Sequence, residues 1–121
     1  MTFCTFETSS LLEVGKVVRQ ESDSIVYNDD TDLNKIVGII SDSYQDEDTS
    51  KFYAQVHMGG GVTYAVLSEN WNGLWSPIAV HLNSIKPALS SESKHGYLIP
   101  SLPPVAKVAG ESVAIYWRGV I

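Results

Sequence analysis

The chain has 121 residues, of which 44% are hydrophobic and 18% are charged. These proportions suit one globular domain with its own core and exclude a disordered chain. The formal net charge of −6, from 14 acidic and 8 basic side chains, argues against general binding to nucleic-acid phosphates. No apolar run approaches the roughly 20 residues that span a bilayer. Cys4 is the single cysteine, which excludes an internal disulfide and a cysteine metal cluster.

The sequence begins with a polar segment rich in Thr and Ser, residues 1–11. It has neither the basic region nor the long apolar core of a signal peptide, so we expect a protein made and used inside a cell or carried on a particle. Phe3 and Phe6 stand in this polar background. We predict a flexible N-terminal arm over residues 1–11, either frayed or ordered on a partner, and a single β-rich domain over residues 12–121.

Short runs of β-branched residues predict strands in the first half of the domain. Val14–Arg19 and Ile25–Tyr27 flank a polar tip and predict a hairpin, which the turn formers of residues 28–32 close. Ile36–Ile40 predicts a further strand. Gly38 lies inside it and indicates a bulge or the close approach of another backbone.

An acidic loop follows at residues 41–50. It predicts a solvated tip, because its carboxylate spacing does not match a calcium-binding EF-hand loop. Lys51–Met58 then alternates apolar and polar residues, which predicts a strand. Gly59–Gly61 predicts a turn through positive φ, and Val62–Leu67 the returning strand.

Turns and prolines interrupt the second half. Trp71–Pro77 is rich in turn formers, and Ile78–Asn83 alternates as a strand does. Ser112–Arg118 alternates again and predicts an edge or closing strand that ties down the chain end. Four prolines break the chain between these two segments: Pro87, Pro100, Pro103 and Pro104.

Together these segments predict an all-β fold. We expect a small single-domain barrel or sandwich of short antiparallel strands with the flexible N-terminal arm. At most one or two short helices fit, near residues 67–71 or 82–89, because neither stretch has a sustained helical period.

No residue pattern predicts catalysis. The three histidines, His57, His81 and His95, lack the close pairing of a zinc site and are expected to be surface or structurally satisfied residues. No nucleophile elbow, P-loop or Rossmann glycine pattern occurs. We therefore expect no enzyme activity, no metal and no cofactor.

The aromatic residues of the second half leave three interpretations open. Trp71, Trp75 and Tyr97 could close the ends of a small barrel, form an interface with another protein, or stack on a sugar. Pro77 joins this candidate interface because it ends the segment that holds both tryptophans. The interface is favoured over the sugar site, since Trp and Tyr are enriched at protein interfaces.

One part of the chain resembles a known family. Val26–Thr31, the strand Ile36–Ile40, the pair of aromatics in Lys51–Tyr53 and the segment Gly61–Tyr64 follow one another around a polar loop. This order is similar to that of the small head-decoration proteins of lambda-type tailed bacteriophages. A wider set of phage virion β-domains, in tails and fibres, shares the rhythm.

The resemblance implies a structural virion protein, made in the host cytoplasm and carried on the virion. It implies a trimer that stabilises the shell by binding the major capsid protein, without nucleic acid or membrane as partners. The N-terminal arm would add backbone hydrogen bonds to a capsid strand, and its contact residues would be Thr2, Phe3, Thr5 and Phe6. The alternative is a tail or fibre module that engages a host glycan or an adaptor protein.

Overall fold

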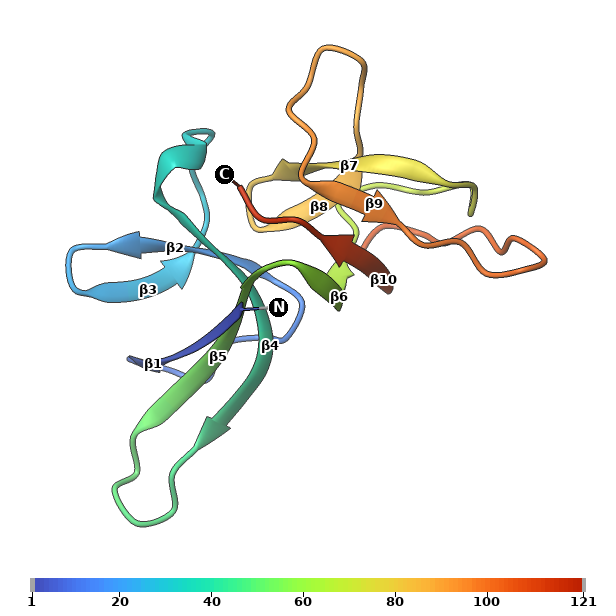
Figure 1. Cartoon of the computed structure of the whole chain (residues 1–121). Coiled ribbons are helices and arrows are strands. Elements are labelled where there is room, and N and C mark those ends of the chain that lie inside the picture. The colour runs from blue at the N-terminus through green and yellow to red at the C-terminus, as the bar shows by residue number, and fades with distance from the viewer. Residues whose placement is uncertain (1, 121) are drawn as a thin grey trace.

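The computed structural model describes residues 2–120 and confirms the all-β prediction. Two antiparallel five-stranded sheets make up one small domain (Figure 1). Sheet A holds, in spatial order, β1 (Thr2–Thr8), β5 (Phe52–Gly59), β4 (Ile36–Gln45), β2 (Val17–Glu21) and β3 (Ser24–Tyr27). Sheet B holds β6 (Gly61–Val66), β10 (Ser112–Trp117), β9 (Gly96–Leu98), β7 (Ser76–His81) and β8 (Ser84–Pro87). Across residues 2–120 the helical structure is a single 3-10 turn, η1 (Leu33–Lys35).

Strands β2 and β4 bury both faces at Val17–Val18 and at Ile39–Ile40. Val17 and Ile39 are register partners and pack into the core that sheet B covers, whereas Val18 and Ile40 point the other way into the core of sheet A. All four side chains are fully buried. Burial of one such side chain stabilises a fold by about 1.5–3 kcal/mol, so this pair of strands joins the two cores into one domain.

Each core is built from the inward residues of its own sheet. The core of sheet A contains Leu12, Val18, Ile25, Ile40, Ala54 and Val56. The core under sheet B contains Val17, Ile39, Ala65, Leu67, Trp71, Ile78, Ile85, Leu98, Val113, Ile115 and Trp117. The alternation predicted for the last strand is confirmed, because Val113, Ile115 and Trp117 all point inward. That strand is not an edge, however: β10 lies between β6 and β9.

Gly38 allows the close backbone approach that the sequence indicates. A Cβ atom at this position would overlap the carbonyl oxygen of His57 on the neighbouring strand β5. The ladder between β2 and β4 also shifts register next to it, between Val18 and Arg19. Both features predicted for Gly38 are therefore present.

The prediction of a returning strand after the three glycines is wrong. β5 and β6 do not pair with each other; the chain leaves sheet A at Gly59 and enters sheet B, where β6 pairs with β10. Gly59 and Gly60 have φ of +144° and +83°. A Cβ at Gly59 would lie 2.6 Å from the carbonyl oxygen of Arg118, so glycine lets the crossing pass directly beside the end of β10.

The structure corrects the expectation of a free N-terminal arm. Thr2–Thr8 forms strand β1, which pairs with β5 along its whole length at the edge of sheet A. Most of its side chains are exposed, while Phe6 packs against the core of sheet A and Glu7 pairs with Lys51 at 3.2 Å. Backbone hydrogen bonds hold this strand, and a polar composition gives no warning of them.

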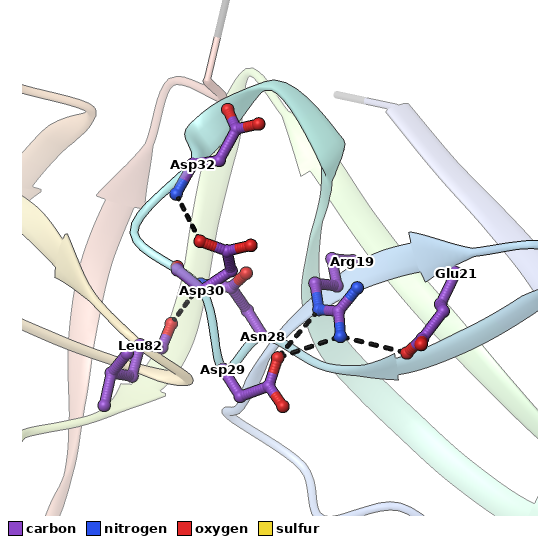
Figure 2. Close-up of polar contacts among 7 residues, drawn as sticks. All are labelled: Arg19, Glu21, Asn28, Asp29, Asp30, Asp32 and Leu82. Atoms are coloured by element: carbon purple, nitrogen blue, oxygen red, sulfur yellow. Dashed lines mark hydrogen bonds and ion pairs between the residues drawn. The ribbon is translucent and has the colours of Figure 1, made fainter.

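Polar contacts fasten the turn after β3 to sheet B (Figure 2). The side-chain amide of Asn28, fully buried, donates to the carbonyl oxygens of Leu82 at 2.7 Å and Asp30 at 3.0 Å. Arg19 holds the same turn from the other side, since its guanidinium pairs with Asp29 and Glu21, both at 2.9 Å. The Asn28–Leu82 bond therefore links the two sheets through one side chain.

Replacing Asn28 by alanine should weaken the joint between the sheets. The carbonyl of Leu82 would lose its side-chain donor, so we expect Asn28→Ala to lower the free energy of unfolding by about 1–3 kcal/mol. Urea unfolding followed by tryptophan fluorescence measures this change. The exposed Asn34 supplies the control, because Asn34→Ala should change the free energy by less than about 0.5 kcal/mol. Equal stability of both variants would mean that the Asn28 contact does not hold the sheets together.

Candidate functional site

The outward face of sheet B is the candidate functional surface. Strand register places Pro77 beside Tyr97, Tyr97 beside Tyr116, and Tyr116 beside Val62, so one row runs across four strands. Inward packing of Ile115 and Trp117 on β10 forces the residue between them, Tyr116, to point outward.

Three aromatic rings lie next to one another on this face, and we call Trp75, Tyr97 and Tyr116 the aromatic ladder. Trp75 and Tyr97 stack with centroids 5.4 Å apart and planes at 28°. Tyr97 and Tyr116 follow at 6.1 Å and 31°. The exposed fractions are 60% for Trp75, 41% for Tyr97 and 37% for Tyr116, so the ladder offers a large aromatic surface to solvent.

The outward strand positions around the ladder are uncharged. The outward positions of β6, β9, β10 and the start of β7 hold no charged side chain. An antiparallel sheet with one solvated face normally carries polar and charged residues there. A contiguous apolar patch on a soluble domain marks an interaction surface. The exposed members beside the ladder are Val62, Tyr64 and Ile99.

Three of the four predicted interface residues lie on this face. Trp75 and Tyr97 belong to the ladder, and Pro77 occupies the register position next to Tyr97. Trp71 does not belong: it is 5% exposed in the core under sheet B, and its indole N–H donates to the carbonyl of Leu74 at 2.7 Å. The interface predicted from the sequence did not include Tyr116, although the alternation of β10 places it on the other face of the strand from Trp117.

The stacking of the rings indicates which kind of partner fits. A sugar platform presents ring faces to the solvent, whereas Tyr97 has Trp75 stacked on it and Tyr116 tilted beside it. Edges and hydroxyl groups therefore make up much of what the ladder exposes. Such amphipathic rings next to aliphatic side chains are typical of protein interfaces.

A second exposed feature lies beside the ladder. Figure 1 shows the segment between β9 and β10 projecting from sheet B. We call residues 99–106 the proline loop; residues 101–106 are all exposed, and Leu102 reaches 90%. Its base is fixed, because Trp71 and Lys107 exchange backbone hydrogen bonds of 2.8 and 2.9 Å. The loop is thus an uncharged projection on a rigid support.

The residues predicted for the arm are already engaged in the domain. Thr2, Phe3 and Thr5 are exposed on β1, and Phe6 is half-buried against the core of sheet A. The ring of Phe3 meets the ring of His57 edge-on at 4.7 Å. Phe6 is therefore held by the core, whereas Phe3 keeps part of its surface open to solvent.

Two of the three histidines are buried where the sheets meet. His57 accepts a hydrogen bond at Nδ1 from the N–H of Gly59 at 3.1 Å, while Nδ1 of His95 lies 3.3 Å from the carbonyl of Gly119. Burial lowers the pKa of both side chains below the ordinary value of imidazole. Nε2 of each ring has no hydrogen-bond partner within residues 2–120, and burial disfavours the charged form of both rings.

Neutral buried histidines make the fold sensitive to acid. The pKa of each histidine is lower in the folded protein than in the unfolded chain, so below about pH 6.5 the unfolded chain binds more protons than the folded protein. The contribution of the neutral histidines to the free energy of unfolding is therefore complete above that pH and is lost as the pH falls below it. We expect the free energy of unfolding to fall between pH 7.5 and pH 5, by at most about 1.4 kcal/mol per pH unit for each histidine. Urea titrations at several pH values measure the slope.

A matched pair of variants tests whether His57 causes this pH dependence of the free energy of unfolding. His57→Asn keeps an acceptor near the Gly59 N–H and should flatten the decline, whereas His81→Asn changes an exposed side chain and should leave it as in the wild type. The same decline in all three proteins would remove His57 as its cause.

Other chemistry finds little support in the part of the chain that the structure describes. No group of three or more His, Cys, Asp or Glu side chains within residues 2–120 is arranged to hold a metal ion. No helix there is long and apolar enough to cross a membrane. One hollow of about 610 Å³ lies between β2 and η1 and has a mixed lining that includes Gln20, Lys35, Val37 and Met58. The aromatic ladder remains the most distinctive surface.

Comparisons of this chain with protein-family models, with curated proteins and with solved structures find no match. The fold and the candidate site therefore rest on the geometry described above.

Proposed function

We propose that this protein is a non-catalytic structural protein that binds other protein subunits through the aromatic ladder. The uncharged outward positions of β6, β9, β10 and the start of β7, together with the exposed rings of the ladder, carry the proposal. The resemblance of residues 25–64 to phage head-decoration proteins supplies the setting: a virion component whose partner is the major capsid protein.

The proposal moves the contact surface away from the N-terminus. An arm that adds a strand to a capsid subunit needs free backbone groups, and β1 already pairs with β5. Its other edge faces β3, which lies close to β1 within the same curved sheet. Side chains on sheet B are therefore better placed for a partner than the backbone of residues 2–8.

The exposed area suffices for a modest contact. Trp75, Tyr97, Tyr116 and Tyr64 expose between 37% and 61% of their surface, and fully open rings present roughly 200 Å² each, so the four supply about 400 Å². A standard interface buries about 800 Å² per partner. Many copies on a symmetric shell would add avidity to such a contact, and binding only the assembled shell would stabilise it by mass action.

A glycan-binding tail or fibre module is the second candidate. The 60% exposure of Trp75 favours it, because the ring at the end of the ladder has only Tyr97 stacked on it. One ring face can stack on a sugar. The same variants separate the two functions.

Removing two ladder rings should abolish shell binding without unfolding the protein. We expect Trp75→Ala combined with Tyr97→Ala to weaken co-sedimentation with shells of the major capsid protein from the same genome at least tenfold, because central aromatic residues dominate interface energy. The stacked pair Tyr44 and Tyr53 on sheet A, with centroids 5.6 Å apart, supplies the control: Tyr44→Ala should bind as the wild type does.

Thermal unfolding must first show that the variants are folded. Normal shell binding by the double ladder variant would contradict the proposal. The glycan module would be established instead by two results together. The wild type would not bind shells, and oligosaccharides would change the tryptophan fluorescence of the wild type but not that of Trp75→Ala.

A further inference from the structure

The proline loop and the aromatic ladder lie next to each other, and neither contains a charged residue. We infer that the proline loop of one copy docks on the aromatic ladder of a second copy, and the reverse, about a two-fold axis. This inference rests on the proposed function, in which the ladder binds protein: in the free protein a second copy of this chain occupies the ladder, and the shell subunits displace it on binding.

The loop has the composition that aromatic surfaces bind. Its sequence, Ile-Pro-Ser-Leu-Pro-Pro-Val-Ala, contains three prolines and no charge. Apolar proline rings and aliphatic side chains lose water-exposed surface when they pack on aromatic rings. Leu102 is 90% exposed and Val105 is 51% exposed, so two aliphatic side chains have apolar surface that a contact could bury.

The distribution of charge permits copies to meet through sheet B. Residues 1–60 hold 11 acidic and 4 basic side chains, a net −7, whereas residues 61–121 hold 3 acidic and 4 basic ones, a net +1. Contact through sheet A would bring two strongly negative surfaces together, which is unfavourable. Contact through sheet B brings two nearly neutral ones together, and neither the loop nor the ladder contains a charged residue.

The position of the loop favours a reciprocal contact. Tyr97 lies on β9, which leads into the loop, and Tyr116 lies on β10, which follows it. A two-fold axis beside this end of sheet B places each loop over the other ladder, so every contact is made twice. The loop thereby adds Ile99, Leu102 and Val105 to the roughly 400 Å² of aromatic surface and brings each copy toward the ~800 Å² of a standard interface.

Sedimentation velocity over a range of concentrations tests the inference. We expect the wild type to dimerise reversibly and Leu102→Asp to raise the dissociation constant at least tenfold, because a carboxylate would be carried onto the aromatic rings. Leu89, exposed by 62% in another loop, supplies the matched control: Leu89→Asp makes the same change and should dimerise as the wild type does.

Directed cross-linking tests the pairing of loop and ladder. In a Cys4→Ser background, chains with Leu102→Cys and differently tagged chains with Tyr116→Cys should form mixed disulfides under mild oxidation faster than either forms with a Leu89→Cys chain. A wild type that stays monomeric, forms trimers, or dimerises equally well with Leu102→Asp overturns the inference. The proposed function fails on a different observation, namely normal shell binding by the double ladder variant.

Discussion

The structure depends on one constraint, the burial of both faces of β2 and β4. Val17 and Val18, adjacent in sequence, point into different cores and are both fully buried. A stretch with two buried faces cannot alternate apolar and polar residues, so consecutive apolar residues occur at Val17–Val18 and at Ile39–Ile40. Because Ile39 packs in the same core as Ile115 and Trp117, these residues also fix the inward face of β10, and Tyr116 between them points outward.

Local patterns in the sequence predict the strands better than their partners. The alternation of β10 and the turn formers after Tyr27 identify elements that the structure contains, because side-chain period and turn chemistry are local properties. Pairing is not local. The glycines at residues 59–61 suit a hairpin as well as a crossing, and packing against the end of β10, about sixty residues later, decides between them. The pairing of β1 is hidden for the same reason.

The candidate site shows the same division. Trp75 and Tyr97 are 22 positions apart, and only the register of β7 on β9 brings them into one stack. Trp71 and Trp75 look alike in the sequence, yet Trp71 is drawn inward because it pairs with Lys107 across the base of the proline loop. Composition identifies the aromatic residues of an interface; which of them face solvent is a property of the assembled sheet.

The edges of both sheets leave little backbone open to another chain. The free edge of β1 lies against β3 in the curved sheet A, and β6 meets β8 through the bridge between Leu67 and Ile85. Edges that face each other leave little backbone for a foreign strand, which protects a small β domain from aggregation. In a domain built in this way, the side chains on the sheet faces are more accessible to another molecule than the backbone at the edges. On sheet B, the outward positions of β6, β9, β10 and the start of β7 hold no charged group, and this is the surface on which the proposed function depends.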